Sequence, residues 1–242
     1  MKTIDLNCDV GEGTGNDQLL MPYISSCSIA CCGHFGTKNS IRETIDLALS
    51  NNVKVGAHPA YSDPDNFGRK SIQISNKNLQ DSLRKQLDLF FSISSITNHI
   101  KPHGALYNDL FNDTEKAEAV VEVFVEYGKS FKIYCAPNSQ LGKASHNAGF
   151  GVIYEGFGDR AYTKNGGLLA RNQTGALLKT KETIAKQFIQ IVQQSKVLSI
   201  EGEIIPLEVQ TICLHGDGEN VIEHLHFLVK ELNKNNICVE SS

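Results

Sequence analysis

The stretch NHIKPHGAL, residues 98–106, joins a short apolar run to a lysine and a histidine at its end. Lys101 and His103 are two residues apart, so they share one face if the run is a strand. A lysine on an apolar strand is rarely buried without a charged partner or a chemical role. We therefore predict a buried strand over residues 98–104 whose carboxyl end carries functional groups.

The same arrangement recurs along the chain. Further short runs that are apolar on both faces, as in buried parallel strands, occupy residues 3–9, 27–33, 53–59, 131–137, 151–156 and 209–216. Between them apolar residues recur at helical spacing, for example at Leu79, Leu83 and Leu87. Alternating strands and helices predict βαβ units that build a parallel sheet.

The polar residues at the ends of these runs distinguish a barrel from an open sheet. An open sheet concentrates functional groups at one switch point, whereas a barrel gathers them from many strand ends into one mouth. Six runs carry such a group at or just after their end, namely Asp9, His34, His58, His103, Glu155 and His215. We therefore predict an α/β fold, a distorted (β/α) barrel of about seven parallel strands, in one domain over residues 1–242. The glycine-rich residues 157–175 are too long for an ordinary connection and are predicted to be an active-site loop.

Composition narrows the functional classes. The net charge of -4 argues against a nucleic-acid or anionic-membrane partner. No apolar run approaches the roughly 18 residues that span a bilayer. Seven cysteines, with no CxxC pair, indicate reduced thiols and a cytoplasmic protein. The chain contains no P-loop motif, no GxGxxG motif and no Gly-x-Ser-x-Gly elbow.

Two acids and three histidines form the predicted catalytic centre. Asp9 and Glu12, in NCDVGEG, could bind a metal or divide acid and base roles, although either could instead cap the next helix. His34, His58 and His103 are expected in the same mouth. Asp9, His58 and His103 make a candidate metal-binding set. With Lys101 included, the predicted catalytic residues are Asp9, Glu12, His34, His58, Lys101 and His103.

Lysine and arginine side chains are the candidates for binding an anion. Lys101 could neutralise an anion or stabilise an oxyanion, and the alternative is a salt bridge to Glu155 or Asp9. Arginine binds carboxylate and phosphate groups with two parallel hydrogen bonds, and three arginines lie in loops on the same side, namely Arg69, Arg160 and Arg171. The alternative for them is surface ion pairing, to Asp65, Asp159 or Glu155. Asp217 could serve the site or only cap the last helix.

Six segments together resemble the signature blocks of the LamB/YcsF family, over residues 5 to about 219. They are DLNCDVGEG (5–13), SIACCGHFG (28–36), VGAHPAYSDPDNFGR (55–69), IKPHGALYN (100–108), EGFGDRAYTKNGGLLARNQTGALL (155–178) and VQTICLHGDGE (209–219). The resemblance implies a barrel related to the glycoside hydrolase/deacetylase group, with fewer than eight strands. It also implies the A subunit of an ATP-dependent 5-oxoprolinase, which opens 5-oxo-L-proline to L-glutamate with subunits B and C. Thr37 departs from the family pattern, which has an acid there.

Carried onto this chain, the family motifs also indicate substrate-binding residues, namely Asn7, Arg69, Glu155, Asp159, Arg160, Arg171, His215 and Asp217. ATP would be bound mainly by the partner subunits, which would phosphorylate the amide oxygen, and a divalent metal is a candidate cofactor. Lys101 and the arginines would then hold the anionic groups, while Asp9 or His103 directs water onto the activated ring. The alternatives are a stand-alone metal-dependent deacetylase or amidohydrolase, and a non-catalytic substrate-binding subunit.

Overall fold

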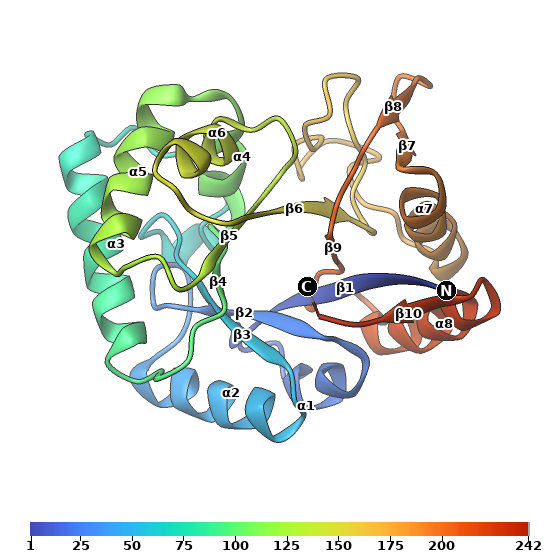
Figure 1. The fold of residues 1–242 in the computed structure, drawn as a ribbon, viewed down its shortest axis with the longest axis horizontal. Coiled ribbons are helices and arrows are strands. Elements are labelled where there is room, and N and C mark those ends of the chain that lie inside the picture. The colour runs from blue at the N-terminus through green and yellow to red at the C-terminus, as the bar shows by residue number, and fades with distance from the viewer. Residues whose placement is uncertain (242) are drawn as a thin grey trace.

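A closed barrel of seven parallel strands forms the centre of the molecule, as predicted (Figure 1). The computed structural model describes residues 1–241. Each barrel strand pairs in parallel with the next, and β9 pairs with β1 to close the ring. The strands are, in order, β1 (Lys2–Val10), β2 (Ser26–Ala30), β3 (Lys54–His58), β4 (His99–Ile100), β5 (Lys132–Cys135), β6 (Val152–Phe157) and β9 (Thr211–Cys213).

The barrel is distorted at the seam beside β1. The first residues of β1 pair with β10 (Ile237–Val239), in the register Lys2 with Ile237. Further along β1 the neighbour on this edge is β9, in the register Asp5 with Thr211. An additional strand therefore extends the sheet at the amino end of β1, where Figure 1 shows β1 and β10 side by side.

Helices surround the barrel and cover its outer face (Figure 1). They are α1 (Asp17–Leu20), α2 (Lys38–Ser50), α3 (Asn76–Phe91), α4 (Gly104–Asn112), α5 (Thr114–Glu126), α6 (Gln140–Asn147), α7 (Lys181–Gln194) and α8 (Val221–Lys234). The predicted apolar face of Leu79, Leu83 and Leu87 is buried in α3. Thr37, which departs from the family pattern, forms a capping box with Ser40 at the start of α2.

Several connections differ from the predicted pattern. A short antiparallel hairpin, β7 (Lys196–Leu198) with β8 (Ile204–Pro206), lies outside the barrel and was not predicted. Two 3-10 turns follow α1 and β3, over Met21–Tyr23 and Pro64–Asn66. None of the helices in residues 1–241 is long and apolar enough to cross a bilayer.

The predicted ends of three strands were wrong because the backbone leaves the sheet earlier. The second strand stops at Ala30 rather than at residue 33, since Cys32 has a φ of 68°, outside the extended region. The fourth strand stops at Ile100 rather than at residue 104. The N–H groups of Lys101 and His103 still donate to the carbonyls of Ala57 and Pro59, but Pro102 between them has no N–H to donate. The last barrel strand ends at Cys213 rather than at residue 216. His34 therefore lies in a loop beyond the strand end.

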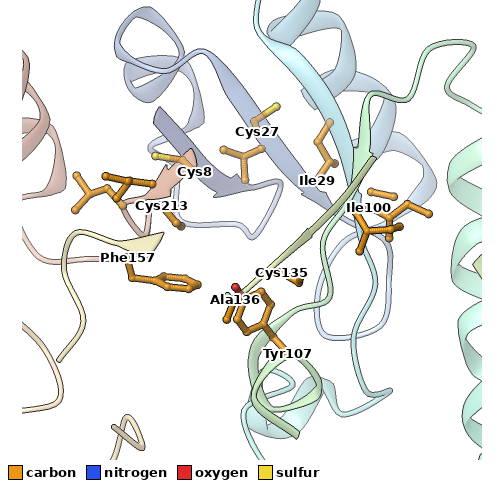
Figure 2. Close-up of a cluster of buried hydrophobic side chains, with 14 of the residues drawn as sticks. Cys8, Cys27, Ile29, Ile100, Tyr107, Cys135, Ala136, Phe157 and Cys213 are labelled. Atoms are coloured by element: carbon orange, nitrogen blue, oxygen red, sulfur yellow. The ribbon is translucent and has the colours of Figure 1, made fainter. Parts of the chain in front are cut away.

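The interior of the barrel is polar. Successive side chains of β1 point to opposite faces, and Leu6, Cys8 and Val10 belong to the hydrophobic core (Figure 2 shows Cys8 there). The alternate residues of β1 carry polar groups. Asp5, the one nearest the amino end of the strand, accepts hydrogen bonds from the hydroxyls of Ser25, Ser26, Tyr134 and Thr211. A buried carboxylate is tolerated here because hydroxyl donors surround it.

His99, which the sequence places among the structural histidines, is buried in the next layer. Its Nε2 lies 3.1 Å from Ser28 Oγ, and its ring stacks on Tyr134 with centroids 3.9 Å apart. Gly56 on the neighbouring strand leaves room for this ring. A Cβ atom at position 56 would lie only 2.2 Å from His99 Nε2.

We expect Gly56→Ala to lower the free energy of unfolding by about 1–3 kcal/mol, because the new methyl group displaces the buried imidazole. Chemical denaturation followed by circular dichroism measures this change. Gly151→Ala is the matched control, since its Cβ would meet nothing nearer than Lys132 Cγ at 3.5 Å. An equal stability for Gly56→Ala and the unaltered chain would contradict tight packing at His99.

Candidate active site

A cavity of about 690 Å³ opens at the carboxyl ends of the barrel strands. Asp9, His58, Lys101 and His103 line it, and they come from the ends of β1, β3 and β4 or just beyond. These four predicted residues are therefore brought together, as a barrel mouth requires. Other predicted residues in the lining are Arg69, Arg160, Arg171 and His215.

Lys101 is held by three acceptors. Its Nζ lies 2.8 Å from Asp9 Oδ1, 2.7 Å from Glu155 Oε1 and 3.2 Å from Asn7 Oδ1. Burial alone would lower the pKa of Lys101, but the nearby carboxylates outweigh it and hold the pKa well above its usual value. An ammonium group has three N–H donors, and all three are engaged here. Lys101 therefore positions Asp9 and Glu155.

Asp9 is ionised in this setting. Burial alone would raise its pKa, but the His58 imidazole and the Lys101 ammonium outweigh it, so the pKa of Asp9 lies well below its usual value. While Oδ1 accepts from Lys101, Oδ2 lies 3.3 Å from His58 Nε2. One oxygen of Asp9 thus faces the histidines.

Backbone carbonyls fix the tautomers of His58 and His103. His58 Nδ1 lies 2.7 Å from the carbonyl oxygen of Lys101, and His103 Nε2 lies 3.0 Å from that of Phe67. A carbonyl oxygen only accepts, so these two nitrogens carry the hydrogens. Burial, with the adjacent histidines, lowers the pKa of His103 well below its usual value, which keeps its ring neutral. The remaining nitrogens, His58 Nε2 and His103 Nδ1, face each other at 2.9 Å.

Glu12 contacts His103 and also His34, which is another of the predicted catalytic residues. Its Oε1 is 2.8 Å from His34 Nε2 and 3.3 Å from His103 Nδ1. Burial and the Asp9 carboxylate raise the pKa of Glu12 to about 7, and burial lowers the pKa of His34 to about 4. Glu12 is therefore able to exchange a proton near neutral pH.

Three overlapping sets of side chains could hold a cation. The first is Asp9, His58 and His103, the second is Glu12, His34 and His103, and the third is Asp9, Cys213 and His215, and within each set the ligand atoms lie within 4.8 Å of one another. The first set presents one carboxylate oxygen and two ring nitrogens whose opposite N–H groups are anchored on backbone carbonyls. That second-sphere arrangement is typical of histidines that bind a metal.

The rim of the cavity carries an ion-paired cluster. Arg69 and Arg171 both donate to the carboxylate of Asp217, the latter at 2.9 Å. Burial would raise the pKa of Asp217, but Arg171, His215 and Arg69 outweigh it and lower the pKa to about 2. Asp217 is not the cap of α8, whose N-cap is Asn220. The partner of the two arginines is thus Asp217, rather than the acids considered from the sequence.

Arg160 is a buried cation that no carboxylate pairs with in residues 1–241. It is 4% exposed, its Nη2 donates to the Leu169 carbonyl at 2.6 Å, and its Nε has no partner there. The neighbouring Asp159 instead accepts from His215 Nδ1 at 2.9 Å. Arg160 also lines the cavity, and a guanidinium group is suited to binding an anionic ligand.

The remaining predicted residues support the cavity without lining its main part. Asn7 lies beneath Lys101, and its amide donates to Glu155 at 2.9 Å and to Thr211 at 2.7 Å. Sequence reasoning missed Tyr107, which lines the cavity four residues after His103. The segment HGALY places Tyr107 one helical turn after His103 and directly after a strand end, and this spacing could have identified Tyr107 from the sequence.

The comparisons with known proteins agree along the whole chain. A model of the LamB/YcsF family matches residues 4–242. The A subunit of 5-oxoprolinase from Bacillus thuringiensis subsp. konkukian (strain 97-27) is 35% identical over 249 residues, which cover 99% of this chain and 98% of the relative.

Solved structures give a consistent result. The Lactam Utilization Protein from Thermus thermophilus is similar with a TM-score of 0.89 and 29% identity, over 100% of both chains. The family 4 carbohydrate esterase from Streptomyces lividans has a TM-score of 0.51 and 9% identity, over 98% of this chain and 91% of the esterase. The latter similarity concerns the fold alone.

Proposed function

The chain belongs to the LamB/YcsF family, and from that premise we propose that it is the A subunit of an ATP-dependent 5-oxoprolinase. The complex would open the lactam of 5-oxo-L-proline to L-glutamate, with subunits B and C as partners. The observation that carries the proposal is the joint presence, in one cavity, of a hydrolytic cluster at Asp9, His58 and His103 and an unpaired buried cation at Arg160.

Arg160 is the group we assign to the substrate carboxylate. Three other cations of the cavity are already engaged, Lys101 by Asp9 and Glu155, and Arg69 and Arg171 by Asp217. A guanidinium with a free Nε matches a carboxylate or phosphate oxygen, and burial strengthens the charge-assisted hydrogen bond. 5-Oxoproline carries one carboxylate, and a phosphorylated form would add a second anionic group.

The hydrolytic cluster offers a position for water beside the substrate carbonyl. Asp9 Oδ2 and His103 Nδ1 both face His58 Nε2. A water molecule in contact with Asp9 and His103 would therefore have an acceptor for each of its two hydrogens. Either Asp9 or His103 would receive the proton as water attacks the ring. Glu12, in contact with His103 and with a pKa of about 7, would take that proton up at neutral pH.

The residues present also fit a divalent cation such as Zn²⁺. Asp9, His58 and His103 would hold it, because their free oxygen and two ring nitrogens converge while the opposite N–H groups are anchored on Lys101 and Phe67. When bound, such a cation polarises a carbonyl and lowers the pKa of a coordinated water.

Resonance makes the lactam a poor electrophile, and a single general base provides only about 10²–10⁴-fold. We assign activation of the amide oxygen by ATP to the partner subunits, since this sequence contains no P-loop motif. We also assign the activity to the cytoplasm, because all seven cysteines are free thiols.

Reconstitution tests this division of labour. We expect the purified chain alone neither to hydrolyse ATP nor to consume 5-oxo-L-proline, and the cognate subunits to restore both activities with ADP release tied to glutamate formation. Both products are measured in one assay, with an acetylated sugar as a parallel substrate. ATP-dependent glutamate release by the isolated chain would contradict the proposal, and efficient deacetylation without ATP would favour a stand-alone deacetylase.

A further inference from the structure

Asp159 and His215 follow two neighbouring strands of the barrel, β6 and β9. In the register of this strand pair Phe157 lies beside Cys213, and both are labelled in Figure 2. Side chains two residues apart share one face of a strand, and two residues further along the chain come Asp159 and His215. The parallel pairing of β6 with β9 therefore brings a carboxylate and an imidazole together at the mouth of the barrel.

The two side chains form a closely held pair. His215 Nδ1 lies 2.9 Å from Asp159 Oδ2 and 3.0 Å from Oδ1, and the backbone N–H of His215 donates to Oδ2 at 3.2 Å. Burial alone would raise the pKa of Asp159, but His215 and Arg160 outweigh it and hold the pKa below its usual value. The ionised carboxylate only accepts, so His215 Nδ1 carries a hydrogen.

The other ring nitrogen, His215 Nε2, is left free. It makes no hydrogen bond within residues 1–241, and His215 lines the main cavity with its side chain 12% exposed. The ring stacks on Phe157 with centroids 5.5 Å apart, which restricts its orientation. A ring nitrogen of His215 also lies within 4.8 Å of a carboxylate oxygen of Asp9, so the pair borders the hydrolytic cluster.

Ring opening needs a proton donor that the hydrolytic cluster does not supply. Attack by water gives a tetrahedral adduct, and its C–N bond breaks readily only if the leaving nitrogen gains a proton. The N–H groups of His58 and His103 already donate to backbone carbonyls, and all three donors of Lys101 are engaged. Among the cavity-lining histidines of the described chain, His215 is the one that remains.

We propose that His215 is the general acid of the ring opening, that its Nε2–H protonates the leaving ring nitrogen, and that Asp159 positions the ring and stabilises the imidazolium form. This inference rests on the proposed function and assigns the second half of the reaction. The electron pair of the broken C–N bond forms the new N–H bond with the proton of Nε2, and an oxygen of the adduct re-forms a carbonyl group. His215 then regains a proton from solvent, and the hydrolytic cluster releases the proton that it took from water.

Two neighbouring side chains bear on this assignment. The Tyr107 hydroxyl also belongs to the cavity lining, but burial raises the pKa of Tyr107 well above its usual value, which makes it a weak acid. Cys213 could hold a cation together with Asp9 and His215, but burial raises the pKa of its thiol well above the usual value. A metal binds the thiolate, so this set is a weaker cation site than Asp9, His58 and His103.

Steady-state kinetics of the reconstituted complex with His215→Asn test the inference. The Asn amide can still donate to Asp159 in the place of Nδ1, but nothing replaces Nε2. We expect kcat for glutamate formation to fall by about 10²–10⁴-fold, the contribution of a general acid, with the KM for 5-oxo-L-proline unchanged. The matched control is His146→Asn, which changes an exposed histidine of α6 and should keep full activity.

Asp159→Asn tests the positioning role. Its amide oxygen can accept from Nδ1 but carries no charge, so it stabilises the imidazolium form less well. We expect kcat to fall by a smaller factor than in His215→Asn, and Asp159→Glu, which keeps the charge, to recover part of the loss. Equal kcat in Asp159→Asn and the unaltered complex would overturn the role of Asp159.

The outcomes separate this inference from the proposed function. No glutamate formation by the unaltered reconstituted complex would overturn the proposed function and the inference with it. Full kcat of His215→Asn, in a complex that opens the lactam, would overturn the inference alone. So would a raised KM at unchanged kcat, which indicates substrate binding, or loss of a bound divalent cation, which indicates a metal ligand. Circular dichroism verifies folding, and His215→Gln replaces the Asn variant if that variant does not fold.

Discussion

Asp9→Asn is expected to lower ATP-dependent glutamate formation by the reconstituted complex by about 10²–10⁴-fold, the contribution typical of a general acid–base group. Asn keeps the shape and one hydrogen bond to Lys101 but removes the negative charge that faces His58. The same change should abolish retention of a divalent cation, since it removes the carboxylate ligand of the Asp9, His58 and His103 set. Steady-state kinetics and elemental analysis of the purified chain measure the two effects.

The folded state should persist in Asp9→Asn, because Lys101 retains Glu155 as an ionic partner. The control is His226→Ala, which changes an exposed histidine of α8 and should keep full activity. Full activity of Asp9→Asn would remove Asp9 from the reaction. A variant that only unfolds would assign Asp9 a structural role.

Lys101→Met is expected to lower the free energy of unfolding by about 3–5 kcal/mol, the usual cost of breaking a buried ion pair. Lys101 is 1% exposed and pairs with Asp9 and Glu155, which are themselves buried. Removing the ammonium leaves two carboxylates inside the barrel without their cation, so they must stay charged at a cost or take up protons. Urea denaturation at neutral pH measures the change.

The matched control is Lys181→Met. Lys181 also pairs with a carboxylate, Glu223 at 2.5 Å, but this pair lies on the surface between α7 and α8. Solvent screens such a pair, so little change in the denaturation midpoint is expected. A similarly small effect of Lys101→Met would contradict the view that Lys101 is the central cation of the barrel interior.

The sequence alone determined the architecture and most of the site. Alternating apolar runs and helical periodicity are local signals, and they predicted a barrel of about seven parallel strands because each such element must bury its apolar faces. The polar residues that follow the strands identified Asp9, His58 and His103, which the structure brings within hydrogen-bonding distance or close to it. Parallel strands direct their carboxyl ends to one side, so closeness in space followed from position in sequence.

Only the tertiary structure decided which polar groups are left free. Arg160 and Arg171 look alike in the sequence, yet Arg171 pairs with Asp217 and Arg160 has no carboxylate partner within residues 1–241. A hydrogen bond forms only when two groups lie within a few ångströms of each other, and here the two groups often come from segments far apart in the chain. A local sequence pattern determines the face and the end of a strand at which a side chain lies, whereas closure of the barrel determines which groups that side chain contacts.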